Sequence, residues 1–316
     1  MKHIFIIFLA FPLLVSCPAE VIDMINSYSD RINSTPVLLD YDVISNSNAV
    51  FHFDNPVLFT DIRLNGKENY KNGVWKKMQS IKFDTPLSSS ENTLSFSVIN
   101  REGNSSRYTM KISSVNEDQA SLLITEASIK GTKDSPDRIE LTCMERGSTD
   151  GIVIADAEKD SADHLFFLPH MKLEKGDIII VYWDSDPDYP SSFKRGGNTT
   201  YKLSAQSEET LISTNGAIVL YSSINGKGDI MDALLYNKSG AEDSDGFGNK
   251  KSQNTYTEME KRGQWSGQTV LSDEVTASRV IARCYPYEDT DTCDDFYITK
   301  ARHSTFGYVN TNEAYK

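Results

Sequence analysis

Two short acidic clusters carry the side chains best suited to bind a metal ion. One follows an apolar run near residue 184, and the other lies in a Gly-rich stretch near residue 243. Ca²⁺ takes about six to eight oxygen ligands, and closely spaced carboxylates on a turn can supply part of that set. Solvated loop charge is the alternative explanation for each cluster. The candidate ligands are Asp184, Asp186, Asp188, Asp243 and Asp245.

The second cluster partly matches the spacing of an EF-hand calcium loop. With Asp243 at the first position, Asp245 takes the third and Gly248 the sixth, as such a loop requires. The position of the bidentate Glu is occupied by Asn254 instead. We therefore expect no cofactor, and a structural Ca²⁺ ion stays a hypothesis.

Cys284 and Cys293 are the candidate disulfide. They share an acidic, turn-rich segment, and the N-terminus described below places the chain outside the cytoplasm, where disulfides persist. The bridge would close a loop of about ten residues and stabilise the fold by about 2.5–3 kcal/mol in the chain-entropy model. Free thiols are the alternative. Cys143 alternates with Ile139 and Leu141, which predicts an inward-facing, unreactive thiol without a basic neighbour.

The sequence lacks the motifs that carry common catalytic chemistry. Neither a G-x-S-x-G elbow, an H-E-x-x-H pair, a Walker-type loop nor a G-x-G-x-x-G turn occurs. His164 and His170 flank Pro169 in a loop-like segment, and His52 alternates with apolar residues on the solvent side of a strand. We therefore expect no catalytic residues and no enzyme activity. The formal net charge of −13 also argues against a protein that binds nucleic acid.

The N-terminus has the pattern of an export signal. Lys2 precedes an apolar run over residues 4–15 that is too short to span a bilayer. Residues 14–17, Leu-Val-Ser-Cys, resemble the bacterial lipobox, in which the chain is cut before the Cys and the new N-terminus is lipidated. The resemblance implies a signal peptide over residues 1–16 and a lipid on Cys17. An ordinary cleaved signal with an incidental Cys is the alternative.

Short apolar segments with period-two alternation fill the rest of the chain and predict an all-β protein. Residues 17–35 are a lipidated Cys and a polar tether. Residues 36–117 form an Ig-like β-sandwich, whose segment 92–112 resembles the last hairpin of bacterial Ig-like or cadherin-like modules. Residues 120–312 form a second sandwich with a hairpin over 216–236, and only a stretch such as 272–282 has weak helical character.

The second block resembles the lamin-tail domain, an Ig-like β-sandwich found in bacterial surface and secreted proteins. That family closes with an Asp-Phe segment and a Thr-Pro-Gly-x-x-Asn tail, and here residues 295–296 and 304–310 occupy that place. Cys143, Ile152 and Phe306 depart from the family's usual Asn, Trp and Pro. Residues 184–210 and 237–268 are interpreted as insertions. The resemblance rests on residues 124–126, 139–141, 150–156, 167–169, 173–177, 217–220 and 231–233.

Together these patterns predict two tandem Ig-like β-sandwich domains behind a lipoprotein signal peptide. We expect a non-catalytic protein of the bacterial cell envelope, anchored by its N-terminal lipid, with the outer membrane as its location. It would bind or scaffold a protein or envelope partner through loops at the sandwich ends. An accessory or metal-dependent component of a secreted hydrolase or nuclease is the alternative, because lamin-tail-like domains are sometimes joined to nucleases.

Overall fold

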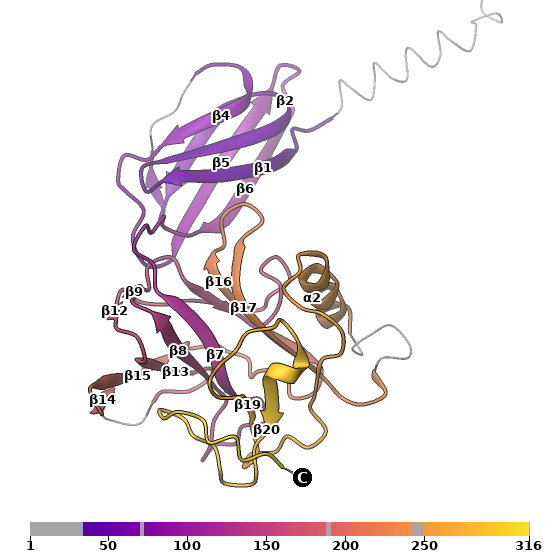
Figure 1. Ribbon diagram of the computed structural model, residues 1–316. Helices are drawn as coiled ribbons and strands as arrows, with labels where there is room; N and C mark the ends of the chain where they lie inside the picture. The colour runs from indigo at the N-terminus through magenta and orange to yellow at the C-terminus, as the bar shows by residue number, and fades with distance from the viewer. Residues whose placement is uncertain (1–33, 70–72, 188–190, 242–248, 316) are drawn as a thin grey trace, which may run out of the picture. The chain divides into compact units, whose positions relative to one another are not determined.

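The computed structural model describes residues 34–69, 73–187, 191–241 and 249–315. The predicted signal peptide, Cys17 and most of the tether lie outside these ranges. Almost every element in the described ranges is a strand (Figure 1), which confirms the predicted all-β class. The chain divides into two compact units. Of the described residues, the first comprises 34–42, 48–69, 73–84 and 93–110, and the second comprises 43–47, 85–92 and those from 111 onward.

The first six strands form one sheet that closes around an aromatic core. The long strand β2 pairs with β4 and, further along, with β5, and the order β1-β2-β5-β6 completes the sheet. Alternation in β5 points Leu94, Phe96 and Val98 inward. The strands are β1 (Leu38–Ser45), β2 (Asn48–Leu64), β3 (Lys67–Glu68), β4 (Lys76–Lys82), β5 (Asn92–Asn100) and β6 (Ser105–Ile112).

The second unit contains a seven-stranded sheet, in the order β14-β15-β13-β8-β7-β19-β20. Strand β13 is buried on both faces, as its continuous apolar run Ile-Ile-Ile-Val-Tyr requires. Strand β14 ends the sheet on one side (Figure 1). The strands are β7 (Ser121–Ser128), β8 (Arg138–Glu145), β13 (Ile178–Tyr182), β14 (Ser192–Arg195), β15 (Asn198–Ser204), β19 (Ile281–Arg283) and β20 (Phe296–Ile298).

A five-stranded sheet, in the order β11-β10-β16-β17-β18, packs its apolar face toward the same core. Strands β16 and β17 form the antiparallel hairpin predicted over residues 216–236. Trp183 and Trp265 are buried in the shared core. The strands are β10 (Val153–Ala155), β11 (Leu165–Phe167), β16 (Gly216–Ser223), β17 (Asp229–Asn237) and β18 (Val270–Leu271), with the small pair β9 (Gly147–Ser148) and β12 (Lys172–Leu173) beside them.

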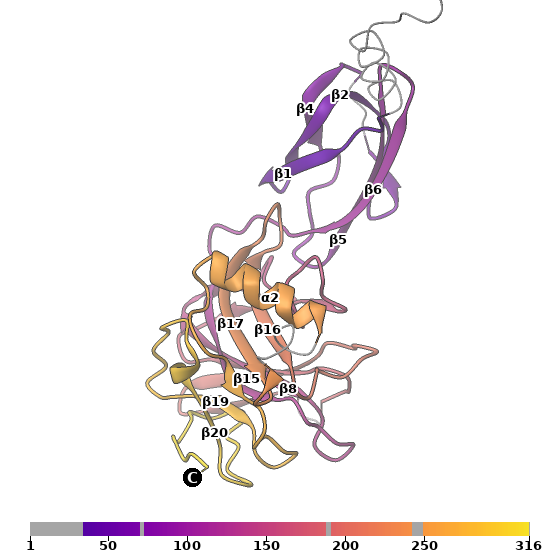
Figure 2. The ribbon, with the colours of Figure 1, turned by 90° about the vertical axis from the view of Figure 1, so that its right-hand side faces the viewer.

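One helix departs from the sequence-based expectation. Helix α2 (Lys250–Lys261) begins at Asn249, whose side chain accepts a hydrogen bond from the Ser252 N–H, and it lies near β16 and β17 (Figure 2). The helical character predicted over residues 272–282 is wrong, because this stretch contains turns and leads into β19. Within the described residues no helix is long and apolar enough to cross a membrane.

Candidate functional site

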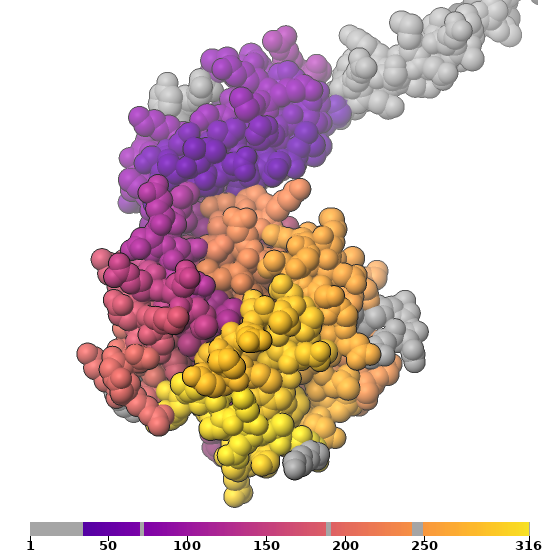
Figure 3. Space-filling model, in the orientation of Figure 1, coloured from indigo at the N-terminus to yellow at the C-terminus, as the bar shows by residue number. Residues whose placement is uncertain are grey.

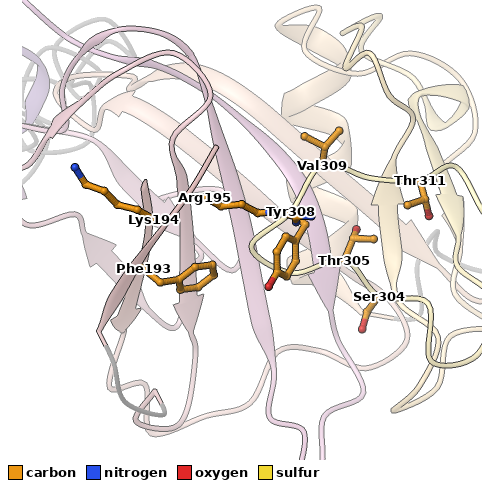
Figure 4. Close-up of a pocket in the computed structure, with 8 residues that line it drawn as sticks. All are labelled: Phe193, Lys194, Arg195, Ser304, Thr305, Tyr308, Val309 and Thr311. Carbon is orange, nitrogen blue, oxygen red and sulfur yellow. The ribbon is translucent and has the colours of Figure 1, made fainter. Parts of the chain in front are cut away.

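An open groove of about 590 Å³ lies in the second unit, between the β14–β15 hairpin and the segment 304–311. In the space-filling view the yellow C-terminal segment abuts the pink hairpin (Figure 3). Side chains from both walls face each other across the groove (Figure 4). The lining residues are Phe193, Lys194, Arg195, Ser304, Thr305, Tyr308, Val309 and Thr311.

The hairpin wall is shaped by a two-glycine turn. Gly196 and Gly197 have φ values of +57° and +101°, and the two strands pair on either side of them. A two-residue hairpin turn with both φ values positive favours glycine, which lacks a Cβ. The turn end of the hairpin is fixed by Asp177, whose carboxylate accepts a 2.7 Å hydrogen bond from the Thr199 N–H. These contacts set the position of Arg195 on the groove wall.

The second wall approaches the sheet closely at Gly307. Its φ is +85°, and a Cβ there would lie 2.9 Å from the Phe193 ring and 3.3 Å from Thr200 Cγ2. The Thr200 hydroxyl donates a 3.2 Å hydrogen bond to the Gly307 carbonyl. A side chain at this position would therefore push the C-terminal segment off the sheet.

Two buried glutamates on the sheet bind the segment 304–311. Glu126 on β7 and Glu140 on β8 are direct partners in the antiparallel register. Glu126 accepts hydrogen bonds from the Thr305 N–H, at 2.9 and 3.0 Å to its two oxygens, and from the Thr305 hydroxyl at 3.1 Å. Glu140 accepts from the Gly307 N–H at 2.6 Å and from the Thr125 hydroxyl at 2.7 Å. The backbone N–H groups of Thr305 and Gly307 are thus satisfied by carboxylate oxygens.

Burial and mutual repulsion shift the pKa values of this pair. Burial raises the pKa of Glu126 to about 7, against the lowering effect of the Thr305 hydrogen bonds. Burial and the neighbouring Glu126 charge raise the pKa of Glu140 well above its usual range. Two carboxylates with raised pKa values suggest acid–base chemistry. However, Glu126 is 1% exposed and Glu140 0% exposed, so their role is to anchor the segment.

Asn310 fixes the far end of the same segment. Its side-chain amide donates to the Thr125 carbonyl at 2.9 Å and to the Arg283 carbonyl at 2.8 Å. Its backbone N–H donates to the Tyr287 hydroxyl at 3.0 Å. Asn310 is buried, so these bonds are shielded from water and hold the groove wall in place.

Arg195 is the cation that faces the groove. Its guanidinium carbon lies 3.9 Å from the centre of the Tyr308 ring, and this ring is 6.1 Å from the Phe193 ring. The Lys194 side chain points away from Tyr308 (Figure 4). Neither cation forms an ion pair within the described residues, and no acidic side chain of the described chain lines the groove. The groove is therefore rich in donors and positively charged.

The candidate disulfide is not formed in the structure. Cys284 and Cys293 are free thiols, although both sulfurs lie near Asp294, at 4.0 Å from its carbonyl and 3.9 Å from its carboxylate respectively. Burial and the neighbouring acids raise the pKa of both thiols. The bridge stays a prediction for oxidised protein. Cys143 is buried, with its pKa raised to about 11, mainly by burial, as expected for an unreactive thiol.

The candidate metal ligands do not form a cluster where they can be placed. Asp184 and Asp186 are exposed, and the described ranges contain no group of three or more His, Cys, Asp or Glu side chains that could hold a metal ion. Asp188, Asp243 and Asp245 lie outside the described residues, as does Cys17. The structural Ca²⁺ ion stays a hypothesis.

The loop histidines have ordinary structural partners. His164 lies 3.0 Å from the Ala205 carbonyl and packs edge-on against Trp183. The His170 ring nitrogen lies 2.7 Å from the Asp150 carboxylate. These contacts fit the interpretation of both histidines as loop residues.

A second buried polar group was not anticipated from the sequence. Arg283 is 0% exposed and bonds both oxygens of Asp232, at 2.7 and 2.8 Å, while its Nε–H donates to the Ile124 carbonyl at 2.9 Å. Burial raises the pKa of Asp232 to about 7, and the guanidinium opposes that rise. The sequence contained one sign of this pair: Asp232 lies inside the apolar strand Ile-Met-Asp-Ala-Leu-Leu, where a charged side chain requires a buried partner.

A family model covers most of the second unit, including the β14–β15 hairpin, and ends before the segment 304–311 that forms the other groove wall. Residues 120–298, more than half of the chain, match the family TP_1001_2nd, whose description is "protein second domain". The chain belongs to this family. No curated relative matches the chain at a significant level.

Proposed function

We propose that the protein is a non-catalytic lipoprotein of the bacterial cell envelope that binds or scaffolds a partner through the groove. The N-terminal lipid on Cys17 would tether it to the outer membrane. The observation that carries the proposal is the groove itself, in which Arg195, Tyr308 and Val309 are presented on anchored walls. Rigid elements that present aromatic and arginine side chains are typical of protein-binding surfaces.

The exposure of the groove rim supports a binding role. Tyr308 is 41% exposed and Val309 54% exposed, although both lie in a segment whose backbone is tied down at Thr305, Gly307 and Asn310. An exposed apolar surface on a fixed backbone costs little entropy when a partner covers it. The rim is therefore better suited to recognition than to core packing.

The lamin-tail resemblance also supports this proposal for the second domain. Three residues at the positions of its closing motif have structural roles that other residue types would not fill. They are Thr305, Gly307 and Asn310. The substitution of Phe306 for the family's Pro is accommodated, since its ring lies 4.3 Å from the Arg138 guanidinium. We therefore propose a lamin-tail-like sandwich as the binding module.

Labelling with an alkyne analogue of palmitate tests the anchor. Wild-type protein expressed in the source cells should incorporate the label and partition with membranes, and Cys17→Ala should lose both properties. Equal labelling of the two proteins would contradict lipidation at Cys17. Protease treatment of intact cells, with a periplasmic protein as control, then distinguishes the outer surface from the periplasm.

Photo-crosslinking in intact cells tests the groove. A photoreactive amino acid at Val309, on the rim, should yield a discrete adduct. The same amino acid at Leu271, which is 50% exposed in the same unit but does not line the groove, is the matched control. Adducts of equal yield at both positions, or none at Val309, would contradict a binding role for this groove.

A further inference from the structure

We propose that the groove recognises an acidic segment of a partner protein, with Arg195 as the residue that determines specificity. This inference rests on the proposed binding function and names the class of its partner. The chain as a whole carries a formal charge of −13. A cationic groove on an acidic protein attracts an acidic segment locally while the remaining surface repels one, so the contact is restricted to this place.

The side chains that line the groove are mainly hydrogen-bond donors. Ser304, Tyr308 and Thr311 present hydroxyls without a hydrogen-bond partner among the described residues, and they line the same groove as Arg195 and Lys194. Of these side chains, Tyr308 lies next to Arg195 (Figure 4). A guanidinium and an ammonium only donate hydrogen bonds, and a hydroxyl can donate one. A ligand rich in acceptors, and above all in carboxylates, matches this set.

The orientation of Arg195 favours a carboxylate in particular. Its face is occupied by the Tyr308 ring, at 3.9 Å from the guanidinium carbon. Stacking restricts the rotation of the guanidinium and leaves its N–H edge available, and two parallel N–H groups match the two oxygens of a carboxylate. Lys194, at the rim, would add a point charge for a second acidic residue.

The apolar part of the groove suits a peptide better than an isolated anion. Phe193 and the exposed Val309 offer contact area to the aliphatic part of a side chain. Glu126 and Glu140 hold the wall that contains Thr305 and Gly307, and Asp177 holds the hairpin wall, so the site exists before the partner binds. A preformed site of this kind binds an extended acidic segment without reorganisation.

Fluorescence anisotropy with a dye-labelled hexaglutamate peptide tests the inference, with hexaglutamine as the neutral probe. The soluble chain from residue 18 onward should bind hexaglutamate and not hexaglutamine, and added salt should weaken binding. Arg195→Gln should weaken binding by about tenfold or more, because it removes a charge-assisted pair. Arg195→Lys keeps the charge but loses the planar fork, so it should bind more weakly than wild type.

Arg146→Gln is the matched control, because Arg146 is an exposed arginine of the same unit that does not line the groove. Equal weakening by Arg146→Gln and Arg195→Gln would overturn the inference, as would equal binding of the two peptides. Displacement of hexaglutamate by an equal concentration of inorganic phosphate would identify a general anion site instead. None of these results bears on the crosslink at Val309 in cells, so the proposed function can stand when the inference fails.

Discussion

Glu126 should make the second unit less stable as the pH rises through neutrality. Burial raises its pKa from 4.5 to about 7 in the folded protein, so between these values the folded state keeps a proton that the unfolded state has lost. The unfolding free energy changes by about 1.4 kcal/mol for each pH unit of such a difference. The contribution of Glu126 is therefore fully present below pH 4.5, falls as the pH rises, and is lost above about pH 7, a change of about 3 kcal/mol.

Glu126→Gln removes this titration and keeps an oxygen that can accept from Thr305. We expect the variant to be more stable than wild type at pH 8 and equal or less stable at pH 4.5. Groups outside the pair with raised pKa values, such as Asp137 at about 6, contribute equally to both proteins and cancel in the comparison. The difference between the two stability curves therefore reports the Glu126 carboxyl together with its effect on Glu140.

Urea unfolding followed by tryptophan fluorescence measures this difference, because Trp183 and Trp265 are both buried in the second unit. Glu208→Gln, at an exposed position of the same unit, is the control and should run parallel to wild type. Parallel curves for wild type and Glu126→Gln from pH 4.5 to 8 would refute the reasoning. They would mean that the carboxyl titrates alike in the folded and unfolded states.

Three further substitutions or treatments probe the structure around the groove. Gly307→Ala should lower the unfolding free energy by about 2 kcal/mol, since its Cβ meets an aromatic ring at 2.9 Å where φ is +85°; unchanged urea midpoints would count against it. Asp232→Asn should cost about 3 kcal/mol, because it leaves Arg283 buried without its main counter-charge; a loss well below 1 kcal/mol would contradict this. Intact-mass analysis of protein purified without reductant should show the loss of two hydrogens, from Cys284 and Cys293, which reductant restores; an unchanged mass would exclude the bridge.

The strands could be predicted from the sequence because the alternation of apolar and polar residues is a local pattern. Alternation in Leu94-Ser-Phe-Ser-Val98 fixes which side chains face inward, and the observed burial follows it. The Asn65-Gly66 pair, with φ values of +52° and +77°, provides the turn that its residue types predict. Elements whose stability is encoded within a few adjacent residues are therefore predictable.

Helix α2 was missed because its buried face is mostly polar. Ser252, Thr255 and Met259 are its buried residues, and only one of them is a large apolar side chain. Ser252 donates to the Asn215 carbonyl at 2.6 Å, and the Thr255 hydroxyl accepts from the Glu158 N–H at 2.9 Å. Tertiary hydrogen bonds take the place of an apolar stripe here, so helical periodicity gives little signal.

The groove could not be foreseen, because its two walls are distant in sequence. The hairpin around Arg195 and strand β20 lie at opposite edges of the seven-stranded sheet. The segment around Tyr308 reaches the hairpin only because it returns across β7 and β8, where Glu126 and Glu140 bind it. Both walls belong to stretches whose sequence suggested an insertion or a tail. The signal that did exist was a glutamate at corresponding places in two apolar strands, at Glu126 and Glu140. A pair of this kind requires donors from elsewhere in the chain.

The Glu126–Glu140 pair and the groove are linked, because the segment 304–311 binds the pair and also lines the groove. Thr305 and Gly307 bind the two carboxyls on their inner side, and Tyr308 presents its ring to Arg195 on the outer side. Ionising both glutamates places like charges directly opposite each other under this segment, which is unfavourable in a sheet. The hydrogen bonds from Thr305 and Gly307 favour the ionised carboxyls, so they oppose this repulsion and the cost of burial without cancelling them. Stability of this domain should consequently fall as the pH rises, while the contacts that hold the Tyr308 wall persist.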